Sequence, residues 1–420
     1  MADKTLKRLS TNFIALASLK LLNYILPLLM IPYLIRVIGM EGFGVYSFIL
    51  AIVMYGSKLS DYGFELSGTY HVSKHQDNKE QINSIFSSIM TIKLLIALFY
   101  ICGVLLVLFL IESFSIYSHL LLLAIGTIVG QALFPLWFFQ GIEQMRYISI
   151  INGVAKLLFF LAVLLFVRHS EDVDTLLLLT TLSSLFAGVW GLYIALKQFT
   201  VQLSFQPLNR LLFYLKEGWY IFTAKLAVEF YTTINIIILG FYASATVVGY
   251  YALSLKIIYA LGGLLEPITQ TVYPHLVNTY QQSKKQFMKR NIQLMMVIFT
   301  IMFPLSLLVY FYAKEILELI TEQEVLSLNI EILQIFSWAL MVYLYGSQFT
   351  NILVTINESK FLNNILLITA GINLFFAPIL LYFFGVIGLA WLGTFVAFFI
   401  AFSKGYYIYT KTMSTKANSF

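Results

Sequence analysis

Long apolar stretches, separated by short breaks rich in charged residues, glycine or proline, dominate this sequence. About twelve such stretches begin near Asn12, Phe43, Ile85, Tyr117, Tyr147, Val173, Trp219, Val248, Ile292, Leu328, Phe361 and Val386. A helix of about 20 apolar residues crosses the roughly 30 Å hydrocarbon core of a bilayer. Charged residues make up only 11% of the chain, which excludes an ordinary soluble domain. The sequence therefore predicts an all-α integral membrane protein with about twelve transmembrane helices.

The basic residues predict how these helices are oriented. If successive helices alternate in direction, sixteen of the 26 basic residues fall in connections on the same side as the N-terminus. Three basic residues, Arg36, Arg168 and Lys314, fall on the opposite side. Because loops rich in lysine and arginine stay in the cytoplasm, we expect both termini to be cytoplasmic. The net charge of +6 then belongs to these loops, so we expect no nucleic-acid partner.

A long polar connection divides the predicted helices into two six-helix lobes. We expect residues 1–196 to form an N-lobe with helices 1–6, residues 197–216 a cytoplasmic connector, and residues 217–420 a C-lobe with helices 7–12. Leucines in and beside the connector, Leu208, Leu211, Leu212 and Leu215, predict a short helix on the membrane surface. Residues 275–290 form a second cytoplasmic amphipathic segment, whose basic side chains are expected to contact anionic membrane lipid.

Several charged residues interrupt the apolar stretches. Seven lysines (Lys20, Lys58, Lys93, Lys156, Lys225, Lys256 and Lys404) and five acids (Asp61, Glu65, Glu229, Glu266 and Glu331) lie within these stretches or at their ends. An isolated charge at the centre of a bilayer costs at least about 2.5 kcal/mol on insertion scales. This many charges must therefore face a polar lumen inside the protein.

Helical spacing predicts which of these charges share a face. Lys58, Asp61 and Glu65 stand at positions i, i+3 and i+7, and Lys225 and Glu229 stand at i and i+4, so both sets predict salt bridges.

Three lysines of the N-lobe, Lys20, Lys93 and Lys156, have no acid within one turn of their own helices. They must pair across helices, extend to the headgroups or bind an anionic ligand. Glu331 and Lys404 are expected at the membrane interface.

No motif for a cofactor or an enzyme active site is evident. The chain lacks a GxxxxGKS loop for ATP phosphates, its five histidines show no metal-ligand spacing, and Cys102 is its single cysteine. The outer loops are too short to hold the active site of a membrane glycosyltransferase or polymerase. We therefore expect a transporter with no catalytic residues, no bound metal and no cofactor.

Several strings carry a family resemblance that extends over nearly the whole chain. They are Pro32-Tyr33-Leu34, Gly39, Phe43-Gly44, Asp61-Tyr62-Gly63-Phe64, Leu66-Ser67-Gly68-Thr69, Trp137-Phe138-Phe139-Gln140-Gly141-Ile142-Glu143, Asn152, Lys156, Lys216-Glu217-Gly218-Trp219, Gly249-Tyr250-Tyr251-Ala252 and Lys256. Together they resemble the Wzx-type flippases of lipid-linked polysaccharide repeat units. These flippases form the polysaccharide transporter branch of the multidrug, oligosaccharidyl-lipid and polysaccharide exporter superfamily.

This resemblance implies a two-lobed, twelve-helix transporter that works by alternating access. The implied substrate is an undecaprenyl-pyrophosphate-linked oligosaccharide of the O-antigen (lipopolysaccharide) or capsule type. It would be moved from the inner to the outer leaflet of the bacterial cytoplasmic (inner) membrane. A polysaccharide polymerase and chain-length proteins are the implied partners.

The buried lysines agree with this substrate, because a pyrophosphate that crosses a low-dielectric interior needs cationic partners. We expect six lysines to line a cationic cavity for the pyrophosphate and sugar headgroup: Lys20, Lys58, Lys93, Lys156, Lys225 and Lys256. Asp61, Glu229 and Glu266 are candidates for coupling the cycle to a proton or sodium gradient.

Three other functions are weighed against this interpretation. A cation-coupled multidrug antiporter of the same fold predicts an acidic, aromatic cavity, and the acid-poor first lobe argues against it. A membrane polymerase or glycosyltransferase that acts on the same lipid-linked sugars would change its lipid substrate covalently. A non-catalytic scaffold for glycan assembly would need no polar lumen.

Overall fold

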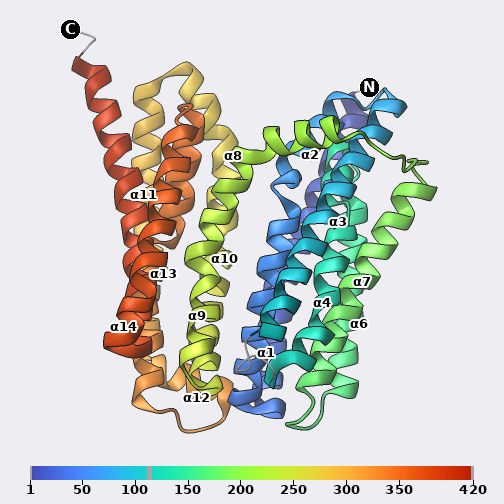
Figure 1. The fold of residues 1–420 in the computed structure, drawn as a ribbon. Helices are drawn as coiled ribbons and strands as arrows, with labels where there is room; N and C mark the ends of the chain where they lie inside the picture. Colours follow the sequence, from blue (N-terminus) through green and yellow to red (C-terminus); the bar gives the residue numbers. More distant parts are fainter. Residues whose placement is uncertain (1, 111–115, 418–420) are drawn as a thin grey trace. The chain divides into compact units, whose positions relative to one another are not determined.

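A computed structural model describes the backbone of residues 2–110 and 116–417, and the side chains of most residues from 26 to 411. Apart from a 3₁₀ turn at Ile116 and Tyr117, the regular secondary structure of these residues is α-helix, which confirms the predicted fold class (Figure 1). The chain divides into two compact units, unit 1 (Met1–Leu226) and unit 2 (Ala227–Phe420).

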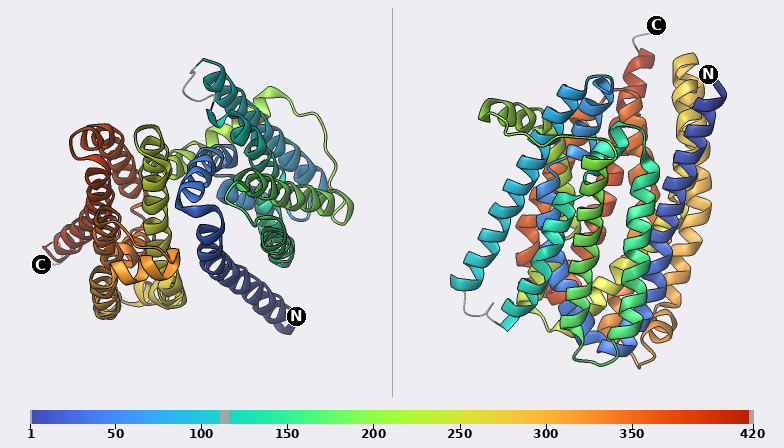
Figure 2. Two further views of the ribbon diagram at one scale, coloured as in Figure 1. Left: turned by 90° about the horizontal axis from the view of Figure 1, so that it is seen from below. Right: turned by 90° about the vertical axis from the view of Figure 1, so that its right-hand side faces the viewer.

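The helices of unit 1 are α1 (Ala2–Asp61), α2 (Phe64–Lys74), α3 (Lys79–Leu110), α4 (Ser118–Leu133), α5 (Leu136–Gly141), α6 (Met145–Phe166), α7 (Val173–Lys197) and most of α8 (Leu208–Thr232). Those of unit 2 are α9 (Ile234–Tyr242), α10 (Ala245–Gln282), α11 (Lys284–Phe311), α12 (Ala313–Thr321), α13 (Ser327–Thr355) and α14 (Ser359–Ala417). In Figure 2, the short α12, in orange, lies across the ends of the longer helices of unit 2.

Ten helical stretches among the described residues are long and apolar enough to span a membrane. The helices α1 and α14 have 60 and 59 residues, respectively. Each would be about 90 Å long if straight, which far exceeds one bilayer crossing. Each is instead broken at a glycine with positive φ, Gly39 (72°) or Gly385 (61°). These breaks lie beside the predicted starts at Phe43 and Val386, so α1 and α14 each contain two of the twelve predicted stretches. The side of the membrane on which the termini lie stays a prediction.

The helices α4 and α7 pack closely because glycines face each other across their contact. Gly126 and Gly130 lie on one face of α4, four residues apart. A Cβ atom at Gly130 would lie 2.4 Å from the carbonyl carbon of Ser184, and one at Gly188 would lie 2.2 Å from the carbonyl oxygen of Gly130. Small residues in such positions let two membrane helices approach until their backbones touch.

Two of the strings that carry the family resemblance pack against each other in unit 1. The side chain of Trp137 in α5 is fully buried, and a Cβ at Gly68 in α2 would lie 3.1 Å from its ring. The hydroxyl of Thr69 lies 3.1 Å from both the Trp137 carbonyl oxygen and Gln140 Oε1. These residues therefore fix α5 against α2.

Lys93 stabilises the end of α4. This helix stops at Leu133, and Pro135 has no N–H to donate to the carbonyl of Gln131, four residues earlier. The Lys93 ammonium lies 3.4 Å from that carbonyl oxygen and 3.3 Å from the carbonyl oxygen of Phe134, with only 3% of the residue exposed. Of the alternatives left open by the sequence, the structure shows a contact across helices, made to backbone oxygens.

The predicted surface helix of the connector and the amphipathic segment belong to longer helices, whereas residues 198–207 of the connector are not helical. Leu208 and Leu212 lie in the first turns of α8, which has 25 residues in all. The first half of α8 is fixed to α2 by a contact of 2.5 Å between His71 Nε2 and Glu217 Oε2. Residues 275–290 form the end of α10 and the start of α11, with Ser283 between the two helices.

Glu358 closes the connection between α13 and α14. Its carboxylate accepts hydrogen bonds of 2.7 Å from Lys411 Nζ and 2.7 Å from the hydroxyl of Tyr407. These donors, with Lys411 the stronger influence, hold the pKa of Glu358 below its ordinary value.

The glycine contact between α4 and α7 gives a first prediction. We expect Gly188→Ala to destabilise the protein by about 1–3 kcal/mol, because the new methyl group meets a backbone oxygen that cannot move aside. Thermal unfolding of the purified protein in detergent, followed by size-exclusion chromatography, measures the effect. Gly103→Ala in α3 is the matched control, since a Cβ there meets nothing within 4 Å. A Gly188→Ala protein as stable as the Gly103→Ala protein would contradict this packing.

A second prediction concerns Lys93. We expect Lys93→Met to lower the thermal unfolding midpoint, because each carbonyl left unsatisfied in the interior costs about 1–3 kcal/mol. Lys285→Met, at an exposed position, serves as the control. If Lys93→Met unfolds at the temperature of the control, the ammonium does not stabilise the end of α4.

Candidate functional site

A charged cluster in unit 1 consists of Lys225, Asp61 and Glu65. The Lys225 ammonium, on α8, lies 3.2 Å from Asp61 Oδ2 and 2.9 Å from Glu65 Oε2. Asp61 is the last residue of α1, and Glu65 lies in the first turn of α2. The turn between them has positive φ at Tyr62 (47°) and Gly63 (76°). This turn allows carboxylates from two helices to meet one ammonium group.

The sequence-based pairing of these charges was wrong. A stripe through Lys58, Asp61 and Glu65 requires one continuous helix, but the turn at Tyr62 and Gly63 ends α1 before Glu65. Lys58 is exposed, and the described ion pairs of Asp61 and Glu65 are made with Lys225.

The predicted pair of Lys225 with Glu229 is also replaced. The carboxylate of Glu229 instead accepts a hydrogen bond of 2.6 Å from the hydroxyl of Thr233.

The charged cluster is accessible and close to electrically balanced. The side chains of Lys225, Asp61 and Glu65 are 36%, 27% and 44% exposed. Lys93 lies within electrostatic range of all three residues. Two lysines thus accompany two carboxylates at this place, so the positive and negative charges are equal in number.

The other predicted site residues lie apart from this cluster. Lys156 is half-buried on α6 in unit 1, and Lys256 is half-buried on α10 in unit 2. The side chain of Lys20 lies outside the described residues. Glu266, also on α10, lines a cavity in unit 2 whose described lining does not include Lys256.

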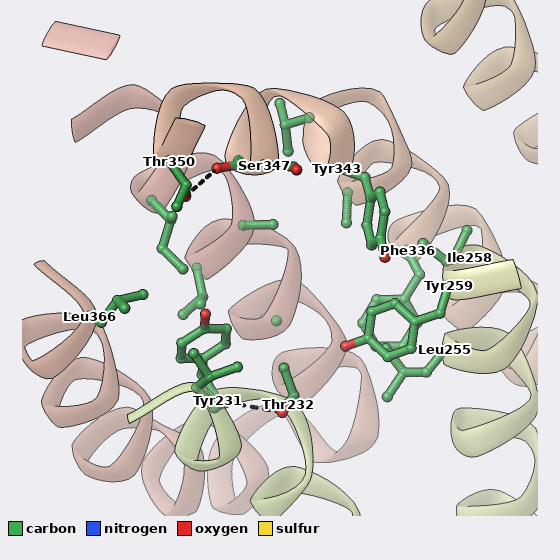
Figure 3. Close-up of a pocket in the computed structure, with 18 of the residues that line it drawn as sticks. Tyr231, Thr232, Leu255, Ile258, Tyr259, Phe336, Tyr343, Ser347, Thr350 and Leu366 are labelled. Atoms are coloured by element: carbon green, nitrogen blue, oxygen red, sulfur yellow. Dashed lines mark hydrogen bonds between the residues drawn. The ribbon is translucent and has the colours of Figure 1, made fainter. Parts of the chain in front are cut away.

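This cavity of unit 2 has a volume of about 490 Å³ and is enclosed by α8, α9, α10, α13 and α14 (Figure 3). Tyr231, Tyr259 and Tyr343 contribute aromatic rings to its wall, together with many aliphatic side chains. Among the residues that the structure describes, Glu266 and Lys404 are its charged lining residues. The cavity therefore combines an apolar, aromatic wall with a few polar groups, as small-molecule sites do.

Lys404 was missed as a site residue, because it was expected at the membrane interface. The structure buries Lys404 to 4% exposure, and its ammonium lies 2.9 Å from Thr350 Oγ1 and 3.3 Å from the carbonyl oxygen of Gly346. The sequence contains a signal for this position. Val396, Ile400 and Lys404 follow one another at four-residue spacing, and all three line the cavity from one face of α14.

Comparison with known sequences places the chain among polysaccharide biosynthesis proteins. Residues 9–280 match the family described as "Polysaccharide biosynthesis protein". A protein of Escherichia coli (strain K12) named "Putative O-antigen transporter" is 30% identical over 271 residues, which cover 64% of this chain and 65% of that protein. A protein of Shigella dysenteriae with the same name is 31% identical over 265 residues, 63% of this chain and 66% of that protein. The match thus spans just under two thirds of the length of each relative.

Solved structures of membrane transporters share the fold. The structure "Lipid II flippase MurJ, inward closed conformation" has a TM-score of 0.75 at 15% identity, covering 95% of this chain and 87% of that one. An inward-facing multidrug resistance MATE family transporter has a TM-score of 0.71 at 13% identity, covering 93% and 99%. Both confirm the fold that the family resemblance implied. With ten apolar spans among its described residues, this fold and a family match over more than half of its length, the chain is a multi-pass membrane protein that belongs to the polysaccharide biosynthesis protein family.

Proposed function

We propose that this protein is a flippase for undecaprenyl-pyrophosphate-linked oligosaccharides of the O-antigen or capsule type. It moves them from the inner to the outer leaflet of the bacterial cytoplasmic membrane by alternating access. The names of its relatives and its similarity to a lipid II flippase support this proposal. The observation that assigns this function to particular residues is the charged cluster. In this cluster an accessible ammonium lies between two carboxylates, on helices that are otherwise apolar.

Lys225 is the residue best suited to bind the pyrophosphate. Its ammonium is bound to carboxylate oxygens, and a phosphate oxygen forms the same kind of charge-assisted hydrogen bond. Its 36% exposure lets an incoming anion compete with Asp61 and Glu65. Lys93 adds positive charge nearby while it remains bound to backbone carbonyls.

The remaining predicted lysines, Lys20, Lys58, Lys156 and Lys256, are proposed as further contacts of the substrate along its path.

The same cluster offers a route for ion coupling. When a proton or a sodium ion neutralises Asp61, the attraction that holds Lys225 weakens, and the ammonium becomes available to phosphate. Loss of phosphate on the other side of the membrane, together with release of the ion from Asp61 on that side, would restore the ion pair, so the ion and the substrate move in the same direction. Glu229 and Glu266 are proposed as additional coupling sites, and the cycle needs no cofactor.

One observation favours the multidrug antiporter as a second candidate. The cavity of unit 2 is lined by tyrosines and by Glu266, which are groups that suit an organic cation. Lys404 lines the same cavity and would repel such a ligand.

If this protein were instead a membrane polymerase or glycosyltransferase, its lipid-linked substrate would be covalently altered.

Association with a polysaccharide polymerase and with chain-length proteins is part of the proposed assembly.

Translocation of a labelled undecaprenyl-pyrophosphate oligosaccharide in proteoliposomes tests the proposal. We expect Lys225→Ala to lower the flipping rate roughly tenfold or more, because hydrogen bonds to charged groups are worth about 1.5–3 kcal/mol each. Lys225→Arg should retain part of the activity, and Lys285→Ala, at an exposed lysine of unit 2, should be unaffected. Wild-type flipping by Lys225→Ala at equal protein level would exclude Lys225 as a binding residue. Efflux of a cationic dye without lipid movement would instead indicate the antiporter.

A second experiment identifies the coupling ion. Flipping by the wild-type protein should accelerate when either a proton or a sodium gradient is imposed. We expect Asp61→Asn to lose this acceleration, because its side chain has no charge for the ion to neutralise. Equal rates in wild-type vesicles with and without both gradients would show that the cycle is uncoupled.

A further inference from the structure

The Lys404 ammonium in the cavity of unit 2 has only neutral partners among the described residues, Thr350 Oγ1 and the carbonyl oxygen of Gly346. An ammonium group has three N–H donors, and these partners use two of them. The described ion pairs give Lys404 no carboxylate partner, although only 4% of the residue is exposed. Because a buried charge is costly unless it is paired, an anionic group within the cavity would supply the missing countercharge.

The walls near this ammonium are suited to a ring that carries hydroxyl groups. In Figure 3, Tyr231 and Tyr259 lie on opposite sides of the cavity; the Tyr259 hydroxyl points across it, and the Tyr231 hydroxyl points toward the side where Thr350 and Ser347 lie. The hydroxyls of Ser347 and Thr350 lie on another wall. Aromatic faces can contact the C–H surface of a sugar ring, while tyrosine and serine hydroxyls exchange hydrogen bonds with its substituents.

We propose that the cavity of unit 2 binds an acidic sugar, that is, a sugar ring that bears a carboxylate or phosphate group. The acidic group lies against Lys404 and Thr350, and the ring lies between Tyr231 and Tyr259. The volume of about 490 Å³ falls within the range of small-molecule sites. This inference rests on the proposed function, since such a sugar would be one unit of the transported oligosaccharide, and it assigns recognition of that unit to unit 2.

Glu266 makes the proposal testable, because removing its charge and removing the charge of Lys404 should change the affinity for an acidic sugar in opposite directions. Its carboxylate lines the same cavity, where it opposes an anionic ligand and can accept hydrogen bonds from sugar hydroxyls. Removal of the charge of Lys404 should therefore weaken binding of an acidic sugar, and removal of the charge of Glu266 should strengthen it. A loss of packing would instead weaken binding in both variants.

The experiment compares methyl glucuronide with methyl glucoside, which differ by a carboxylate. Isothermal titration of the full-length protein in detergent should show methyl glucuronide binding roughly tenfold more tightly. We expect Lys404→Met to abolish this preference, Lys404→Arg and Lys285→Met to keep it, and Glu266→Gln to increase it. If Lys404→Met does not fold, the wild-type preference and the Glu266→Gln effect still decide the question.

Three results would overturn the inference: equal binding of the two sugars, an unchanged preference in Lys404→Met, or weaker glucuronide binding in Glu266→Gln. Binding of dihexanoyl phosphatidylglycerol that depends on Lys404, without glucuronide binding, would assign the cavity to a lipid headgroup and would also overturn it. These measurements use no vesicles and no gradient. Failure of the sugar site is thus distinct from failure of lipid translocation, which the proteoliposome assay detects.

Discussion

Within the hydrocarbon of a bilayer, no water is present to hydrogen-bond a backbone amide or carbonyl, and the chain must supply every partner itself. This constraint explains why the described residues fold into helices, and why departures from the helix are few and compensated. The break at Pro135 leaves a carbonyl without its amide donor, and the Lys93 ammonium takes the place of that donor. A lysine that looks like a candidate substrate ligand in the sequence thus has a structural task in the folded protein.

The same constraint governs the charged side chains, and the two units meet it differently. In unit 1, Lys225 is neutralised by carboxylates at the junction of α1 and α2, so an anionic substrate must compete for it. In unit 2, Lys404 is held by neutral oxygens beside an open cavity. The first arrangement is suited to exchange between ion pairs, and the second to a ligand that brings its own negative charge. A headgroup that carries both a pyrophosphate and acidic sugars contains one anionic group suited to Lys225 and another suited to Lys404.

The fold class was predictable because the apolar stretches are long and the breaks between them are marked by charged residues, glycine or proline. The pairing of charges could not be predicted, because Tyr62 adopts a positive φ that its residue type does not reveal. The turn at Tyr62 ends the helix that contains Lys58, so Glu65 lies in the next helix. The contact between Lys225 and Asp61 joins residues 164 positions apart and depends on how α8 packs. The inward position of Lys404, in contrast, follows from its place on an apolar stripe, and a helical projection of α14 would have revealed it.

The glycines of this protein serve opposite mechanical purposes. At Gly130 and Gly188 the backbones of α4 and α7 already touch, so neither helix can slide or rotate against the other without collision. At Gly39 and Gly385 a side chain would find open space within 4 Å, and a backbone joint interrupts an otherwise continuous helix. In the proposed alternating-access cycle, bending of α1 and α14 would therefore concentrate at these joints, whereas the α4–α7 contact would resist deformation.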